Sequence, residues 1–270
     1  MTETPFYFTN GDYSLFGILH EPARDTSLPA FVFCHPFGEE KLWTQRVFVS
    51  FARLLASEGH PVLRFDYMGN GDSDRDFSES SLRTALADVR CAIAEVRRRT
   101  GASRVNLLGL RLGATIASLA AEDESGIDRL VLWAPIVDGG RYMQELLRIN
   151  LTTQMATHRE IRQDREAMVA VMQHGRTVNV DGYEMALPLY AEVSAVRLSS
   201  DPKRHQGSCL VVQIDRQPGR ASAELQLLTE SYSRATLTSV SEEPFWKEIQ
   251  RFYEQAPNLF AATTSWLRVE

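Results

Sequence analysis

The chain has 270 residues, of which 44% are hydrophobic and 24% charged, and its formal net charge is −6. This length suffices for one large hydrophobic core, and the composition excludes wholesale disorder as well as collagen-like and fibrous folds. An acidic total also argues against a nucleic-acid-binding protein, which normally carries a basic surplus.

The cysteines and the apolar runs restrict the class of protein further. Cys34, Cys91 and Cys209 are odd in number, lie far apart and form no C-x-x-C pair, so they indicate neither a disulfide framework nor a zinc site. The amino terminus lacks a basic segment before a long apolar run, and no apolar stretch approaches about 18 residues. We therefore expect a cytoplasmic protein without a secretory signal or a membrane span.

Short apolar runs alternate with longer amphipathic stretches along the first half of the chain. The runs predict strands at residues 5–20 (a pair joined by Asn10-Gly11-Asp12), 30–34, 61–65, 105–108 and 130–133. The amphipathic stretches predict helices at 44–58, 80–100 and 112–121. Such alternation favours an α/β fold with a mostly parallel sheet that helices cover on both faces.

This alternation breaks after residue 138. Residues 139–203 are charged and helical in pattern, with an irregular piece at 177–183. Strands then return at 209–214 and 235–240, and helices at 221–233 and from 257 to the end. An insertion late in a regular α/β chain is typical of a cap or lid. We therefore expect a core made of residues 1–138 and 204–270, with a helical cap inserted at 139–203.

A turn framed by glycines joins a predicted strand to a predicted helix. It reads Gly109-Leu110-Arg111-Leu112-Gly113, which has the spacing of the nucleophile elbow, G-x-S-x-G. The glycines leave room for a tight turn that projects the central side chain over the edge of the sheet. His35-Pro36-Phe37-Gly38 follows an earlier strand, where a loop that binds an oxyanion would lie, and a glycine-rich turn at 69–73 follows the next strand.

Together these segments resemble the α/β-hydrolase family and its serine-aminopeptidase-like branch. More narrowly, they resemble the hydrolases of type 2 that are encoded beside exosortase A systems. The matching pieces run across nearly the whole chain, at 35–41, 69–73, 109–113, Gly182-Tyr183 and Pro244-Phe245-Trp246. The resemblance implies an α/β-hydrolase fold, activity on acyl esters or thioesters, and a link to an exopolysaccharide pathway.

The sequence departs from the pattern of that family at the elbow and at the histidine. The centre of the elbow is Arg111, whose guanidinium stays protonated and cannot attack a carbonyl. A triad in this fold follows the order nucleophile, acid, histidine. Asp215 occupies an acid position, with Asp138 as the alternative, yet the last histidine of the chain is His205. We therefore expect no Ser-His-Asp mechanism in its usual geometry.

Two roles are open for Arg111. At the amino terminus of a helix its guanidinium adds a bidentate donor to free N–H groups such as that of Leu112, a combination that suits a carboxylate, a phosphate or an acyl carbonyl. Alternatively, Arg111 forms an internal ion pair, for which the sequence offers three acids as partners: Glu39, Glu40 and Asp215.

Glu39, Glu40 and His35 are further candidates for chemistry. A carboxylate of Glu39-Glu40 can activate water if burial raises its pKa, whereas the alternative is the solvated start of the following helix. His35 is a candidate for a catalytic role, and its alternative is a loop residue whose ring hydrogen-bonds the backbone.

The candidate catalytic residues are thus Arg111, Glu39, Asp215 and His35, and the candidate substrate-binding residues are Phe37, Glu40, Leu112, Phe245 and Trp246. We expect no metal and no other cofactor, because the six histidines form neither H-x-x-x-H nor H-x-H and the glycines do not form a dinucleotide fingerprint.

Three functions stay open. The first is an ester or thioester hydrolase that works without a serine nucleophile. The second is a catalytically inactive pseudo-hydrolase that binds an acyl or carboxylate ligand, and the third is a partner protein in an exosortase-linked pathway. A homodimer is also kept open as the oligomeric state.

Overall fold

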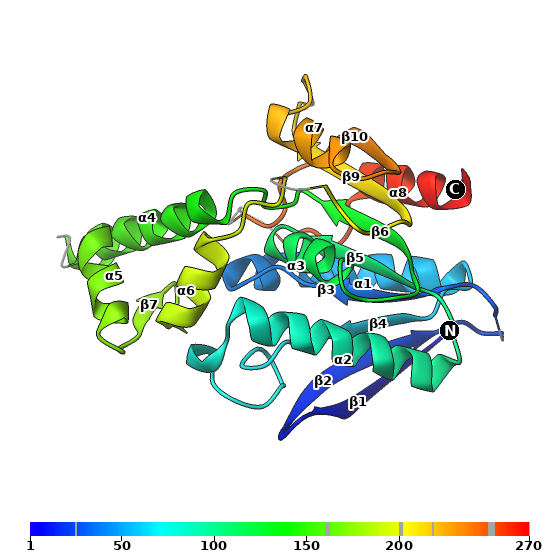
Figure 1. Ribbon diagram of the computed structural model, residues 1–270, viewed down its shortest axis with the longest axis horizontal. Helices are drawn as coiled ribbons and strands as arrows, with labels where there is room; N and C mark the ends of the chain where they lie inside the picture. Colours follow the sequence, from blue (N-terminus) through cyan, green and yellow to red (C-terminus); the bar gives the residue numbers. More distant parts are fainter. Residues whose placement is uncertain (25, 160–162, 200–201, 218, 248–251, 270) are drawn as a thin grey trace.

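The computed structural model describes residues 1–24, 26–159, 163–199, 202–217, 219–247 and 252–269. An eight-stranded sheet crosses the molecule in the order β1-β2-β4-β3-β5-β6-β9-β10 (Figure 1). Its strands are β1 (Thr2–Asn10), β2 (Tyr13–Glu21), β3 (Ala30–Cys34), β4 (Val62–Phe65), β5 (Val105–Leu110), β6 (Ile127–Trp133), β9 (Ser208–Asp215) and β10 (Ala235–Ser241). β2 pairs antiparallel with β1 and β4, and all other neighbours are parallel. The predicted α/β fold is confirmed.

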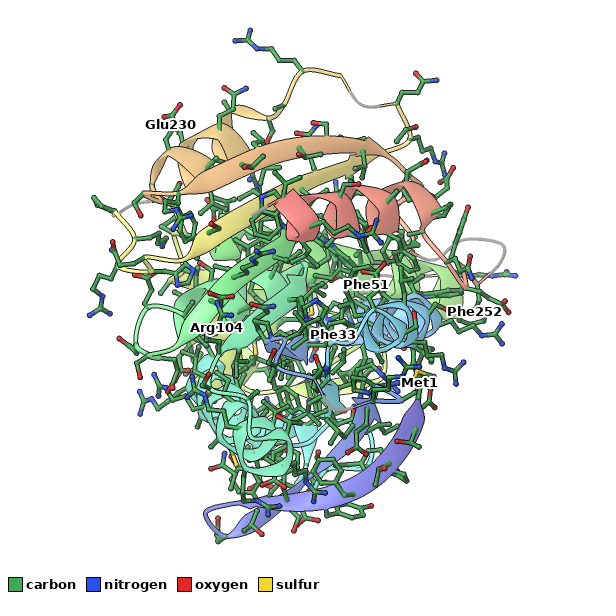
Figure 2. The ribbon with its side chains drawn as sticks, turned by 90° about the vertical axis from the view of Figure 1, so that its right-hand side faces the viewer. Met1, Phe33, Phe51, Arg104, Glu230 and Phe252 are labelled. Carbon is green, nitrogen blue, oxygen red and sulfur yellow. The ribbon has the colours of Figure 1, made fainter. Side chains whose placement is uncertain are left out.

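Helices cover both faces of the sheet and enclose two hydrophobic cores (Figure 1). One face carries α2 (Leu82–Thr100), α3 (Leu112–Ala120) and α7 (Ala223–Glu230), and the other carries α1 (Glu39–Ser57) and α8 (Pro257–Val269). In the core beneath α1, Phe33 and Phe51 are fully buried, whereas Phe252 lies at the surface (Figure 2). None of the described helices combines the length and the apolar character that crossing a membrane requires.

The first long helix starts earlier than its apolar pattern predicts. α1 begins at Glu39 rather than at residue 44, directly after Gly38, which adopts a φ of 54°. Carboxylates are favourable in the first helical turn because they face the positive end of the helix dipole. The prediction from periodicity missed this turn, because the apolar stripe that it follows begins only at Thr44. Glu39 and Glu40 therefore lie at the carboxyl edge of the sheet, on a rigid helix.

The segment between β6 and β9 lies beyond the carboxyl ends of the strands, at the left of Figure 1. It contains α4 (Gly139–His158), α5 (Arg165–Gln173), the antiparallel hairpin of β7 (Val178–Val180) and β8 (Tyr183–Met185), and α6 (Leu187–Ser194). A short 3-10 helix, η1 (Phe77–Glu79), packs beside β8. The piece expected to be irregular is thus largely a hairpin. The division of the chain into a core and a cap stays a prediction.

Candidate functional site

Arg111 stands at the turn between β5 and α3. Its φ of 55° and ψ of −123° are strained for a residue other than glycine. Its backbone N–H donates to the oxygen of Trp133 at 3.0 Å, and its own carbonyl accepts from the N–H of Ala114 at 3.0 Å. Strand, strained residue and helix therefore follow one another without an intervening loop, and the side chain of Arg111 is directed at the carboxyl edge of the sheet.

Two glycines make this turn sterically feasible. A Cβ on Gly109 would overlap the backbone of Gly113 and Ala114, and a Cβ on Gly113 would overlap the carbonyl oxygens of Cys34 and His35. The first turn of α3 thus packs directly against the end of β3. This close approach brings Arg111 next to the loop that begins at His35 and leads into α1.

The side chain of Arg111 is fixed by contacts from three separate segments. Its Nε donates to Oε1 of Glu40 at 3.1 Å, and the hydroxyl of Tyr142 donates to Oε2 of Glu40 at 3.3 Å. The guanidinium carbon lies 5.6 Å from the ring centroid of Tyr142 and 5.3 Å from that of Trp246. Of the three acids that the sequence offers as partners, Glu40 is the one within salt-bridge distance.

Glu40 is an unusual carboxyl group. Burial raises its pKa above the ordinary value, although the charge of Arg111 and the hydrogen bonds from Arg111 and Tyr142 act in the opposite direction. The nearby carboxylate of Glu145 adds to the increase. Glu40 therefore holds a proton more readily than an exposed glutamate does, which is the property that a general base for water requires.

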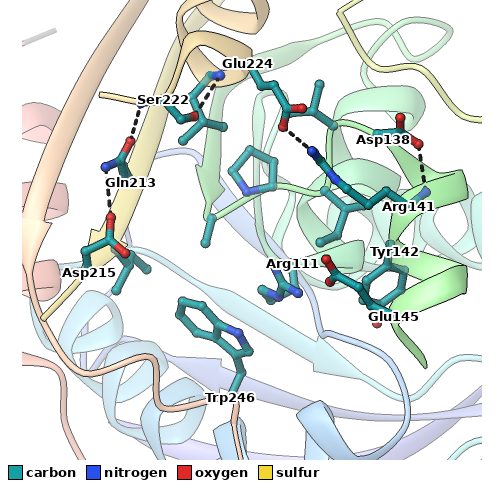
Figure 3. Close-up of a pocket in the computed structure, with 16 residues that line it drawn as sticks. Arg111, Asp138, Arg141, Tyr142, Glu145, Gln213, Asp215, Ser222, Glu224 and Trp246 are labelled. Carbon is teal, nitrogen blue, oxygen red and sulfur yellow. Dashed lines mark hydrogen bonds and ion pairs between the residues drawn. The ribbon is translucent and has the colours of Figure 1, made fainter. Parts of the chain in front are cut away.

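Two cavities meet at Arg111. The elbow cavity has a volume of about 410 Å³ and is lined by Arg111, residues 134–138, Arg141, Tyr142, Glu145, residues 213–215, Ser222, Glu224, Leu225 and Trp246 (Figure 3). The cap cavity has about 580 Å³ and is lined by residues 37–40, Trp43, Arg111, Tyr142, Glu145, Leu146, Arg148, Ile149, Val180, Asp181, Tyr183, Met185, Trp246 and Lys247. Arg111, Tyr142, Glu145 and Trp246 line both cavities, so these four side chains form the wall between them.

Most polar groups of the elbow cavity are bonded to one another (Figure 3). Arg141 pairs with Glu224, and the side chain of Gln213 donates to Asp215 at 2.9 Å and accepts from the N–H of Ser222 at 2.8 Å. Asp215 is exposed and lines the cavity without pairing with Arg111. Among the described residues, no acceptor bonds to Nη1 or Nη2 of Arg111, so these two groups can donate to a ligand in either cavity.

His35 is held by the backbone on both sides of its ring. Its Nδ1 lies 2.6 Å from the oxygen of Pro36, and its Nε2 accepts from the N–H of Tyr67 at 3.4 Å. Burial lowers the pKa of His35 to about 3, so the ring is neutral and both nitrogens are occupied. These contacts match the alternative of a loop residue whose ring hydrogen-bonds the backbone, and a catalytic role for His35 stays a prediction.

The structure places the predicted substrate-binding residues in different environments. Phe245 is 1% exposed, packs in the core under α1 and α8 and lines neither cavity. Phe37 lines the cap cavity and packs on Phe77, and Trp246 lines both cavities. Leu112 is buried at the first position of α3, where its N–H has no acceptor within the helix.

Glu39 lies apart from Arg111 in the first turn of α1. It lines the cap cavity, and its charge adds to the burial that raises the pKa of Tyr183. The sequence reasoning missed Tyr142 and Glu145, which both line the two cavities. Their spacing of three residues on a helix that begins directly after Asp138 was the available signal, because residues three apart share one helix face.

Comparisons with known proteins identify the family and the fold. The chain matches the family described as serine aminopeptidase, S33, over residues 26–184. It is also 26% identical over 136 residues to the quorum-quenching protein AidA from Acinetobacter baumannii, strain MDR-ZJ06. That match covers 49% of this chain and 43% of the relative, so the chain spans less than half the length of that curated protein.

Solved structures resemble the chain over nearly its whole length. Est1E from Butyrivibrio proteoclasticus with bound ferulic acid has a TM-score of 0.67 at 15% identity, covering 97% of this chain and 98% of the other. An esterase from Pyrococcus furiosus has a TM-score of 0.66 at 14% identity, covering 99% of this chain and 91% of the other. A hydrolase structure from Agrobacterium vitis has a TM-score of 0.62 at 16% identity, covering 98% of each chain. At these identities the likeness concerns the fold.

Proposed function

This chain belongs to the serine aminopeptidase, S33 family of α/β-hydrolases, and we propose that it uses its elbow to bind a small molecule carrying a carboxylate or acyl group rather than to attack one. The observation that carries this proposal is the guanidinium of Arg111 at the centre of the elbow, anchored through Nε by Glu40. A guanidinium is a donor of hydrogen bonds and has no nucleophilic lone pair at neutral pH.

The position of the last histidine supports the same proposal. His205 precedes β9, at the amino end of that strand, whereas Arg111 follows the carboxyl end of β5. Since β5, β6 and β9 run parallel, these two residues lie at opposite edges of the sheet. His205 is therefore too remote to take a proton from any group at the elbow.

The shape of the two cavities favours a ligand with one oxygen-bearing end and one apolar end. The ligand's oxygens accept from Nη1 and Nη2 of Arg111, between the rings of Tyr142 and Trp246. An acyl chain or an aromatic ring then fits the cap cavity, whose wall includes five apolar side chains: Trp43, Leu146, Ile149, Val180 and Met185.

Charge alone does not draw an anion into this site. The cap cavity is lined by four acids, Glu39, Glu40, Glu145 and Asp181, and by three bases, Arg111, Arg148 and Lys247. The directed N–H groups of Arg111 therefore decide what binds, and both a carboxylate and the neutral carbonyl of an acyl group satisfy them.

The test uses ferulate, the anion of the carboxylic acid present in the Est1E structure, with isothermal titration calorimetry. We expect Arg111→Gln to weaken binding at least about tenfold, since it removes a charge-assisted hydrogen bond of about 1.5–3 kcal/mol. The matched control is Arg141→Gln, because Arg141 lines the elbow cavity but forms an ion pair with Glu224. Equal affinity of the parent and Arg111→Gln contradicts the proposal.

A second candidate function, ester hydrolysis by activated water, is favoured by the raised pKa of Glu40. In this reaction Glu40 takes a proton from water, and the resulting hydroxide attacks the acyl carbon. Arg111 and the N–H of Leu112 stabilise the oxyanion, and the proton then passes to the departing alkoxide. Turnover of p-nitrophenyl butyrate that Glu40→Gln abolishes, without an adduct from a fluorophosphonate probe, identifies this reaction. Absence of turnover excludes it for this ester.

A further inference from the structure

A third cavity, which we call the side cavity, lies beside β2, β4 and α1 and does not include Arg111. Its volume is about 310 Å³, and its walls include apolar side chains of β2, β3, β4 and α1: Phe16, Ile18, Phe33, Phe65, Leu42 and Phe48. That volume falls at the lower end of the range of about 300–1,000 Å³ that small-molecule sites occupy. Tyr183 lines both the side cavity and the cap cavity and separates them.

Arg64 of β4 lines this cavity, whose charged residues also include Lys41, Asp66 and Asp72. It pairs in register with Ile18, and His20 points to the same face of the sheet because side chains alternate along a strand. Nε of Arg64 donates to Nε2 of His20 at 2.9 Å. Burial, assisted by the charge of Arg64, lowers the pKa of His20 to about 4, so His20 is a neutral acceptor and does not offset the charge of Arg64. The charges of Glu3 and Asp66 favour the charged form of Arg64 without a direct ion pair.

The nearby carboxylates bond to other partners. Among the described residues, no carboxylate oxygen lies within 4.0 Å of a guanidinium nitrogen of Arg64. Asp66 bonds to Nζ of Lys41 at 2.5 Å and accepts from the N–H of Asp72 at 3.2 Å. Glu3 accepts from Arg53 through both of its oxygens.

A bound anion would give the guanidinium of Arg64 the direct partner that the described residues do not supply. Burial lowers the pKa of Arg64, although the charges of Glu3 and Asp66 act in the opposite direction. The two terminal amino groups of Arg64 have no acceptor among the described residues, and Arg64 lines the side cavity. A planar carboxylate accepts two parallel hydrogen bonds from such a fork.

We propose that the side cavity is a second ligand site, in which a compact monocarboxylate accepts from the terminal amino groups of Arg64 while its hydrocarbon body packs between Ile18 and Phe48. The site is independent of Arg111. Its ligand is smaller than one that fills the cap cavity, since the volume of the side cavity is about half as large.

The experiment titrates benzoate into the Arg111→Gln protein by calorimetry, so that the elbow contributes no binding. We expect one benzoate site to remain, and the added Arg64→Gln substitution to weaken it at least about tenfold. Ile18→Trp, which fills the cavity but keeps Arg64, is expected to block the same site. Arg46→Gln is the matched control, because Arg46 is an exposed arginine of α1 that pairs with Glu254 outside the cavity.

Other outcomes overturn the proposal. Benzoate binding that Arg111→Gln alone abolishes places the ligand at the elbow. Binding that survives both Arg64→Gln and Ile18→Trp places it outside the side cavity, and equal affinity for benzyl alcohol shows that no carboxylate is recognised. Absence of any binding at about 10 mM benzoate rejects the site as a carboxylate site. Circular dichroism of each variant confirms that a loss of binding does not reflect a loss of fold.

Discussion

The guanidinium carbon of Arg111 lies 5.3 Å from the ring centroid of Trp246. Arg111 occupies the centre of the elbow, and Trp246 lies in the loop that follows β10. In the order of a triad in this fold, these are the places of the nucleophile and of the histidine. A cation–π contact therefore joins the two positions at which the sequence pattern predicts the nucleophile and the histidine of a triad.

A serine at position 111, without a histidine beside it, is not expected to act as a nucleophile. In Arg111→Ser the hydroxyl has no imidazole to take its proton, so intact mass spectrometry after treatment with a fluorophosphonate probe should show no adduct. In Arg111→Ser/Trp246→His, an imidazole enters the cavity that Asp215 also lines, and we expect labelling of Ser at position 111. Labelling of the single variant at the same rate as the double variant contradicts this prediction.

Gly113→Ala tests the close approach of α3 to β3. The added Cβ would overlap the carbonyl oxygens of Cys34 and His35, which are backbone atoms and cannot rotate away. We expect the free energy of unfolding to fall by about 3 kcal/mol or more in urea titrations. Gly219→Ala is the control, because its Cβ meets no atom within 4 Å. Similar losses in both variants would show that the packing at Gly113 is not special.

Because His35 is neutral in the folded protein, the free energy of unfolding should depend on pH. The pKa of His35 is about 3 in the folded protein and near 6.5 in an unfolded chain, so unfolding takes up a proton between these values. The stability that this group provides is complete above pH 6.5 and decreases as the pH falls, by about 1.4 kcal/mol per pH unit. Urea titrations at about pH 6 and about pH 5 should therefore give a shallower decrease for His35→Gln than for the parent.

The control for this pH effect is His174→Gln, since His174 is an exposed residue that follows the last residue of α5. Between the two pH values, the free energy of unfolding of His174→Gln should decrease by the same amount as that of the parent. The assignment of a neutral, buried ring to His35 fails if His35→Gln also matches the parent.

Asp88 provides a test of the fold away from the site. It is fully buried, and its carboxylate accepts from the amide of Asn10 at 2.8 Å, the hydroxyl of Tyr13 at 2.7 Å and the N–H of Met68 at 2.9 Å. Asp88→Asn replaces one acceptor oxygen by a donor that faces other donors, which should cost about 2–3 kcal/mol of unfolding free energy. Asp12→Asn, at an exposed aspartate, should change it by less than about 0.5 kcal/mol.

Local patterns in the sequence located most of the sheet. β3 begins and ends at the predicted residues, because a short apolar run between polar segments is a local property of the chain. The start of α1 was missed because Glu39 and Glu40 lie outside the apolar stripe of that helix. The environment of Phe245 is likewise not a local property of the chain, because whether its ring lines a cavity or fills a core depends on packing against α1 and α8.

The sequence by itself determined the frame of this site: two glycines around Arg111, an acid at the end of β9, and no histidine after residue 205. Only the tertiary structure decided that Arg111 pairs with Glu40, that Tyr142 and Trp246 flank it, and that His35 is bound to the backbone. The reason is physical. The strength of a charge pair and the pKa of a carboxyl group depend on distance and burial, and these are set by segments far apart in the chain that meet at one edge of the sheet.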